Sequence, residues 1–174
     1  MKKYAVIFCL LLPGSIFSQN KDMVDGYVSF QYNTTIHDRT KSNNKNGVGL
    51  GLELLLNSGK WIRPALQVNG CLFGGTKEFY TTIDGKPIYS KQTIATIFGG
   101  FQFNTGKHLF SSLTAGAAFY NGNSHFGVRP SLGFYLSTNK KAALYTSYTN
   151  IFQKDEISDE PFGYISFALA LKFL

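Results

Sequence analysis

The chain has 174 residues and a formal net charge of +7. Its Lys and Arg residues are scattered along the chain and form no clustered stripe, which excludes the usual electrostatic footprint of a nucleic-acid-binding protein. Beyond the N-terminal segment described next, Cys71 is the only cysteine, which excludes an intrachain disulfide and a cysteine-based zinc site.

The first eighteen residues have the layout of a secretory signal peptide. Lys2 and Lys3 precede an apolar stretch from Tyr4 to Leu12, and Ser18 offers a small residue for cleavage. The apolar stretch is about nine residues long, far short of the roughly twenty that a membrane-spanning helix needs. We therefore expect residues 1–18 to be removed and residues 19–174 to form one exported domain.

The first two predicted strands show strict alternation of side-chain character. In residues 26–36, Val28, Phe30 and Tyr32 alternate with polar residues, and after a polar segment at 37–46 the alternation resumes up to Leu56. The residues that alternate with the apolar ones in the second strand are Gly47, Gly49, Gly51 and Glu53. Each strand therefore has one apolar and one polar face.

Three short segments, at 57–60, 104–107 and 137–140, share one turn-forming pattern: two polar residues, then Gly or Asn, then Lys. This pattern favours a three-residue hairpin loop whose Gly or Asn adopts a positive φ. The predicted pairs that close these loops are Leu56 with Lys60, Phe103 with Lys107 and Leu136 with Lys140. Residues of equal parity should then share a face across each hairpin, and the apolar residues agree with this.

The same alternation continues to the end of the chain, through residues 162–174, and gives eight strands in all. The connections between the hairpins, at 37–46, 74–91, 121–125 and 153–160, are longer and polar. Short turns on one side and longer loops on the other are typical of outer-membrane barrels, in which the short turns and both chain ends are periplasmic. The prediction is an all-β, eight-stranded antiparallel up-and-down transmembrane barrel.

A soluble secreted barrel with an apolar cavity is the alternative, and the polar face argues against it. That face is rich in small residues, which suit a narrow eight-stranded lumen better than a solvated surface. Glu53 is predicted to lie opposite Arg63 across the first hairpin, and Arg129 and Lys172 share their face. These four residues form the predicted polar cluster of the lumen, with more basic than acidic members.

Aromatic residues fall near the strand ends on the apolar face, as expected for interfacial girdles. They are Phe101, Phe103, Phe134 and Phe173 on the turn side, and Tyr32, Phe119, Phe126, Tyr148 and Phe152 on the loop side. Two Arg-Pro pairs, at 63–64 and 129–130, should mark a bulge or weakened strand pairing, because proline donates no ladder hydrogen bond.

The C-terminal run 163–174 resembles the terminal strand that the outer-membrane assembly machinery recognises, although its aromatic Phe173 is penultimate rather than last. Together with the signal-peptide junction at 17–19, the chain resembles the small outer-membrane β-barrel proteins of the Bacteroidetes, and OmpA-type and OmpX-type barrels in architecture. The resemblance implies insertion into outer-membrane lipid, assistance from the barrel-assembly machinery during biogenesis, and no catalytic residue.

Two functions compete for such a barrel. The first is a closed structural or binding protein, in which the loop 74–91 recognises a partner through Phe79, Tyr80 and Tyr89. The second is a narrow pore whose basic lumen, with Arg63, Arg129 and Lys172, prefers anions. The closed barrel is favoured, because eight strands leave little open space.

A third reading is an enzyme that modifies lipid A, with Ser124, His125 and Glu156 near the outer rim. The adjacent Ser and His lie in a short Gly- and Asn-containing segment, where such pairs arise by chance. We therefore expect a monomeric protein with no enzymatic activity, no cofactor, no metal and no nucleic-acid partner.

Overall fold

A computed structural model describes residues 23–36, 44–57, 61–75, 78–81, 87–89, 91–120, 122–152 and 161–174. The predicted signal peptide at 1–18 lies outside this part of the chain. No helix among these residues is long and apolar enough to cross a membrane.

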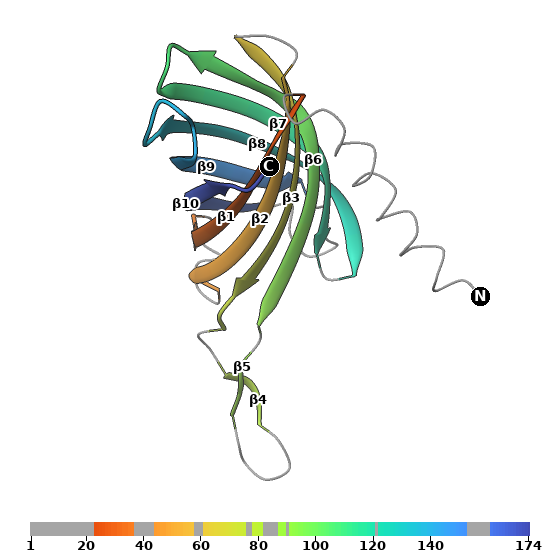
Figure 1. The fold of residues 1–174 in the computed structure, drawn as a ribbon. Helices are drawn as coiled ribbons and strands as arrows, with labels where there is room; N and C mark the ends of the chain where they lie inside the picture. The colour runs from red at the N-terminus through yellow and green to blue at the C-terminus, as the bar shows by residue number, and fades with distance from the viewer. Residues whose placement is uncertain are drawn as a thin grey trace, which may run out of the picture.

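The structure confirms the predicted eight-stranded antiparallel barrel (Figure 1). Its strands follow the closed order β1-β10-β9-β8-β7-β6-β3-β2, so each barrel strand pairs with the next barrel strand along the chain and β1 pairs with β10 to close the wall. The barrel strands are β1 (Val24–Thr35), β2 (Asn46–Leu56), β3 (Ile62–Phe73), β6 (Gln92–Thr105), β7 (Leu109–Tyr120), β8 (Asn123–Tyr135), β9 (Ala142–Phe152) and β10 (Phe162–Lys172).

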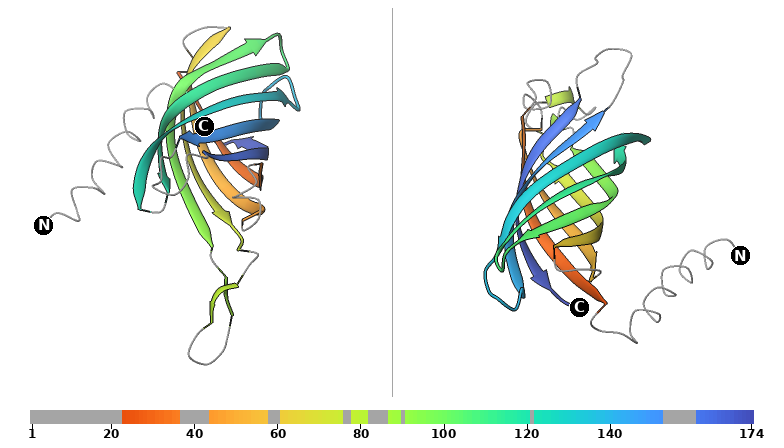
Figure 2. Two further views of the ribbon diagram at one scale, coloured as in Figure 1. Left: turned by 180° about the vertical axis from the view of Figure 1, so that it is seen from behind. Right: turned by 90° about the horizontal axis from the view of Figure 1, so that it is seen from above.

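The predicted loop 74–91 contains two further strands, β4 (Glu78–Thr81) and β5 (Pro87–Tyr89), which form a separate two-stranded sheet. This hairpin projects beyond the barrel, at the end opposite to the C-terminus (Figures 1 and 2). The pairing shifts between Glu78 and Tyr80, which is a β-bulge or irregularity at Phe79. The side chains of Phe79, Tyr80 and Tyr89 lie outside the described part of the structure.

The predicted parity of every hairpin is correct, but the predicted register is wrong at all three turns. In the second hairpin Thr105, not Phe103, pairs next to the turn, and its partner is Leu109. The loop is still three residues long, and Gly106 has the positive φ of 77°. In the third hairpin the Leu136 amide donates to the Ala142 carbonyl, so Leu136 lies opposite Ala142 rather than opposite Lys140. Lys140, not Asn139, has the positive φ, of 56°.

The first hairpin departs further, because the β2–β3 ladder ends at Leu55 and Ala65. The next residue of β3, Pro64, has no N–H to donate to β2, so the pairing stops there. Lys60, the predicted partner of Leu56, lies outside the described residues. The shift also places Gln67, rather than Arg63, opposite Glu53.

The connection predicted at 121–125 is a tight turn, not a longer loop. Tyr120 pairs with Asn123, so that only residues 121 and 122 join β7 to β8. Gly122 has a φ of 78°, and the Asn-Gly dipeptide at these positions is the strongest short signal for a two-residue hairpin. Ser124 and His125 consequently belong to β8.

The two faces of the barrel differ as the alternation predicts. Large apolar side chains point outward on every barrel strand and are widely exposed, including Leu50, Leu113 and Phe167. The polar and small side chains point inward and are mostly buried, as Gln31, Thr114 and Ser166 are. An apolar belt of this extent is not the surface of a barrel in water, since monomeric soluble proteins rarely expose contiguous apolar patches beyond a few hundred Å².

Candidate functional site: the lumen and its rims

The middle of the lumen is filled by a hydrogen-bonded layer of amides and hydroxyls. Gln31 Nε2 donates to Asn69 Oδ1 over 2.8 Å and to Ser29 Oγ over 3.1 Å, and Asn69 Nδ2 donates to Thr96 Oγ1 over 3.2 Å. Gly51 lies against this layer, and a Cβ there would come within 2.6 Å of polar atoms of three of these side chains, those of Ser29, Gln31 and Asn69. The small residue therefore leaves the room that the network occupies.

Arg129 and Glu53 belong to the same layer. Arg129 donates from Nε to Ser147 Oγ over 3.0 Å and from Nη2 to Gln31 Oε1 over 3.3 Å. Gln67 connects the layer to Glu53, because its Nε2 donates to Glu53 Oε1 over 2.8 Å. Both charged groups thus sit among side-chain amides and hydroxyls, which limits the cost of burying them.

Two apolar clusters close the lumen above and below the polar layer, and sequence reasoning missed both. The cluster at the loop end contains Cys71, Phe73, Ile94, Phe98, Ala118, Ile151, Phe162 and Tyr164. The cluster at the turn end contains Tyr27, Leu55, Ala65, Phe110, Tyr135, Ala143 and Ala170. A cavity of about 10 Å³ remains beside Glu53 and Tyr135, room for at most one water molecule.

At the turn-side rim, Arg63 and Lys172 bind an acid that the sequence analysis did not identify. The Arg63 guanidinium forms a salt bridge with the Asp25 carboxylate, whose other oxygen lies 2.5 Å from Lys172 Nζ. Arg63 Nη2 also donates to Asn57 Oδ1 over 2.5 Å. Asp25 precedes the predicted first strand by one residue. Because it has the same parity as Ser29 and Gln31, extending the alternation by one residue would have placed its side chain in the lumen.

The four predicted lumen residues therefore form two groups rather than one cluster. Glu53 and Arg129 lie in the middle layer, while Arg63 and Lys172 lie at the turn-side rim. The predicted contact between Glu53 and Arg63 is wrong, because Glu53 faces Gln67 and Arg63 faces Gln102 in the neighbouring strand.

The Arg-Pro pairs each place an arginine in the lumen and a proline in the wall. Pro130 interrupts the β8–β9 ladder, whose pairs skip from Val128–Asn150 to Ser131–Ser147. Pro64 ends the β2–β3 ladder but keeps its place opposite Phe101 of β6. Weakened pairing at both positions is therefore confirmed.

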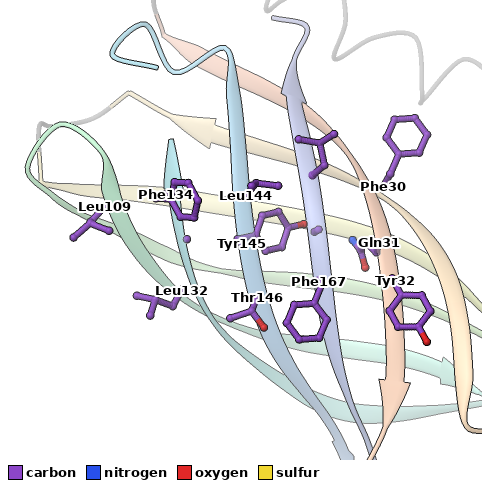
Figure 3. Close-up of a pocket in the computed structure, with 13 residues that line it drawn as sticks. Phe30, Gln31, Tyr32, Leu109, Leu132, Phe134, Leu144, Tyr145, Thr146 and Phe167 are labelled. Atoms are coloured by element: carbon purple, nitrogen blue, oxygen red, sulfur yellow. The ribbon is translucent and has the colours of Figure 1, made fainter. Parts of the chain in front are cut away.

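The outer wall carries a shallow apolar groove of about 750 Å³ over β9 and β10. Figure 3 shows Thr146 between Leu132 and Phe134 on one side and Phe167 and Tyr32 on the other. Because the Thr146 side chain is shorter than its aromatic neighbours, it leaves the groove between them. The groove is part of the outward belt and has no charged lining residue.

Ser124 and His125 do not form a catalytic pair. They are consecutive residues of β8, opposite Phe119 and Ala118 respectively, so their side chains point to opposite faces of the wall. Ser124 is exposed on the outside, whereas the His125 ring lies 6.5 Å from the ring of Tyr120. Glu156, the proposed acid, lies outside the described residues.

The sequence matches no protein-family model and no curated protein sequence. Its fold is similar to the crystal structure of Ail, the attachment invasion locus protein of Yersinia pestis, at 13% identity and a TM-score of 0.57, over 87% of this chain and 99% of that one. The same protein in complex with the heparin analogue sucrose octasulfate aligns at 13% identity and a TM-score of 0.56, over 86% and 97% of the two chains.

A de novo designed transmembrane β-barrel also matches, at 13% identity and a TM-score of 0.50, over 87% of this chain and 96% of the design. At these identities the likeness concerns the fold. What the chain shares with these proteins is a closed, eight-stranded antiparallel barrel.

Proposed function

We propose that this chain is an integral outer-membrane barrel without enzymatic activity, with a closed lumen, that acts through the segments at its loop end. The observation that carries the proposal is the combination of an apolar outer belt with a lumen that two apolar clusters close on either side of a polar layer. The apolar belt requires a lipid environment. Because the lumen is closed to solutes, the protein can act only by binding partners at the ends of the barrel.

The outer belt supports residence in a bilayer. A closed barrel satisfies all of its strand hydrogen bonds internally, which is the condition for crossing hydrocarbon with β-structure. The barrel strands are eleven to fourteen residues long, sufficient to cross a bilayer when tilted. The predicted girdle residue Phe126 stacks on Phe152 of β9 with ring centroids 6.1 Å apart, on the outer face at the loop end.

The packed lumen supports a closed barrel over the anion-preferring pore. The basic groups of the pore hypothesis are Arg63, Arg129 and Lys172. Arg63 and Lys172 both bind Asp25, and Arg129 binds Ser147 in the polar layer. Ions would have to displace the aromatic clusters at both ends to pass. Purified barrel in a planar bilayer should give no stable channels, and reproducible anion-selective openings would contradict this part of the proposal.

The projecting β4–β5 hairpin supports a binding role at the loop end. It forms its own small sheet and makes no strand pairs with the barrel. In the proposed orientation the turns after β2, β6 and β8 and the C-terminus face the periplasm. Phe79, Tyr80 and Tyr89, on the hairpin, are the proposed recognition residues. The barrel-assembly machinery would insert the chain by its terminal strand, and the chain acts as a monomer.

Surface proteolysis tests this orientation. Protease added to intact cells should cut within residues 74–91 and leave the barrel protected, whereas cleavage only after the outer membrane is opened would contradict the orientation. A variant with Phe79→Ala, Tyr80→Ala and Tyr89→Ala should lose binding to cell-surface or matrix material that the wild type retains. Equal binding by the two proteins would remove the hairpin from the proposed function.

A further inference from the structure

A polar pocket of about 290 Å³ opens at the turn-side rim, at the end opposite to β4 and β5. Its walls come from the start of β1, the residue after β2, the start of β3, the end of β6 and the turns that follow β6 and β8. The lining residues are Asp25, Asn57, Arg63, Asn104, Gly106, Lys107, Thr138 and Lys140. The volume lies at the lower limit of small-molecule sites, so the pocket suits a small ligand.

Positive charge exceeds negative charge in this pocket. Three cationic side chains line it, those of Arg63, Lys107 and Lys140, against the single carboxylate of Asp25. That carboxylate is already shared between Arg63 and Lys172. The remaining cations therefore have no acidic partner among the described residues that line the pocket.

Two buried donors of the lining have no hydrogen-bond partner in the described structure. They are Arg63 Nε and Asn104 Nδ2, on side chains that are 2% and 4% exposed. The Asn104 amide is oriented by Gln102, whose Nε2 donates to Asn104 Oδ1 over 2.9 Å and leaves Nδ2 available. Each of the two atoms has less than 1 Å² of accessible surface, so an acceptor in the pocket reaches them when the Arg63 and Asn104 side chains turn toward it. Buried donors almost always have an acceptor, so two of them beside one pocket point to an acceptor ligand.

Lys140 is held at the pocket by its backbone and its ring contact. Its carbonyl accepts a hydrogen bond of 3.1 Å from the Tyr27 hydroxyl, and its ammonium lies 5.1 Å from the centre of the Tyr135 ring. Partial burial lowers the pKa of Lys140, and the positive charges of Arg63 and Lys172 lower it further against the opposing effect of Asp25. An added negative charge at this place would be favourable.

We propose that this pocket is a binding site for a small phosphate-type oxyanion. Arg63 Nε and Asn104 Nδ2 donate to its oxygens from the lumen side once their side chains turn toward the pocket, and Lys107 and Lys140 neutralise its charge from the turns. The ligand is either a soluble phosphate or the phosphate of a lipid headgroup, which present the same chemistry. This site is independent of the proposed recognition at the loop end.

The test uses the full barrel refolded in a maltoside detergent, which contains no phosphate. The side-chain N–H signals of Arg63 and Asn104 are followed by NMR while inorganic phosphate is added in one series and an anionic phospholipid in another. Both signals should move saturably. A variant carrying Lys107→Gln and Lys140→Gln should bind about tenfold more weakly, while Lys141→Gln, an exposed neighbour that does not line the pocket, should match the wild type.

The two series distinguish the sources of the ligand. Saturation by inorganic phosphate supports a site for a soluble anion, and saturation by the phospholipid alone supports a site for a headgroup. The proposal is overturned if neither signal moves with inorganic phosphate or with the phospholipid. It is also overturned if the wild type, the double lysine variant and Lys141→Gln bind with equal affinity. Both substituted lysines lie in turns, and unchanged backbone spectra of the variants verify the fold.

Discussion

Arg63 of β3 is bound to Asp25 of β1, across the intervening strand β2, at the turn-side rim of the lumen. Arg63 and Asp25 are both almost completely buried, and each has further partners: Asn57 for the guanidinium and Lys172 for the carboxylate. The salt bridge joins the first strand to the third, next to the strand pair β1–β10 that closes the barrel. Loss of this salt bridge should therefore lower the free energy of unfolding of the closed barrel.

Asp25→Asn should destabilise the barrel by about 3 kcal/mol, because it leaves a buried guanidinium without its counter-charge. Urea unfolding in lipid vesicles, followed by tryptophan fluorescence, measures the change. Combining Asp25→Asn with Arg63→Gln should recover part of the loss, since no charge then remains unpaired. Lys172→Gln should cost less than 1 kcal/mol, because Lys172 is partly exposed. Equal losses for Asp25→Asn and Lys172→Gln would contradict this assignment.

Gly51→Ala and Gly70→Ala form a matched pair in neighbouring strands. A Cβ at Gly51 would lie 2.5 Å from both Asn69 Oδ1 and Ser29 Oγ, so the polar layer must shift at a cost of about 1–3 kcal/mol. Gly70 faces outward with nothing within 4 Å of the added Cβ, so its substitution should change the unfolding free energy by less than about 0.5 kcal/mol. A neutral Gly51→Ala would show that the lumen is loosely packed.

Leu50→Arg tests whether the outer belt meets hydrocarbon. Leu50 lies in the middle of β2 and points outward, so an arginine there should cost about 2–4 kcal/mol in a bilayer. Leu136→Arg, in the exposed turn after β8, should cost about 0–1 kcal/mol, as expected near the interface. The two unfolding free energies are compared in vesicles of one lipid composition. Equal small effects would indicate that the belt is not embedded in lipid.

Replacement of residues 76–90 by a short Gly-Ser linker should leave the barrel intact. The β4–β5 sheet shares no strand pairs with the barrel, so its removal breaks no ladder hydrogen bond of the wall. The midpoint of urea unfolding should stay within error of the wild type. A large drop would mean that the hairpin packs on the barrel and is part of its fold.

The fold was predictable because the side-chain period of a β-strand is two. A register error of four residues, as where Phe103 pairs with Ser111 rather than with Lys107, moves no side chain to the other face, so the lumen and the belt were assigned correctly despite it. The positions of partners along the lumen axis depend on the register itself. For that reason Glu53 was paired with Arg63, when Pro64 ends the ladder early and brings Gln67 opposite Glu53.

The contents of the lumen were less predictable. Alternation indicates which face a residue occupies, but not which inward residues from distant strands meet at one level. Phe98 of β6 and Tyr164 of β10 meet in the loop-end cluster through barrel closure, which no local pattern encodes. The tight turn at residues 121–122 was missed for a different reason, since its Asn-Gly signal is present in the sequence and was assigned to a longer loop.

Fractionation combined with gel mobility tests the central claim most directly. The protein, expressed with its native N-terminus in a Gram-negative host, should be found in the outer-membrane fraction and should resist extraction by urea. It should also migrate faster on a denaturing gel when unheated than when boiled, as a compact barrel does. Recovery as a soluble periplasmic protein, with one mobility under both conditions, would contradict the account of a lipid-embedded barrel.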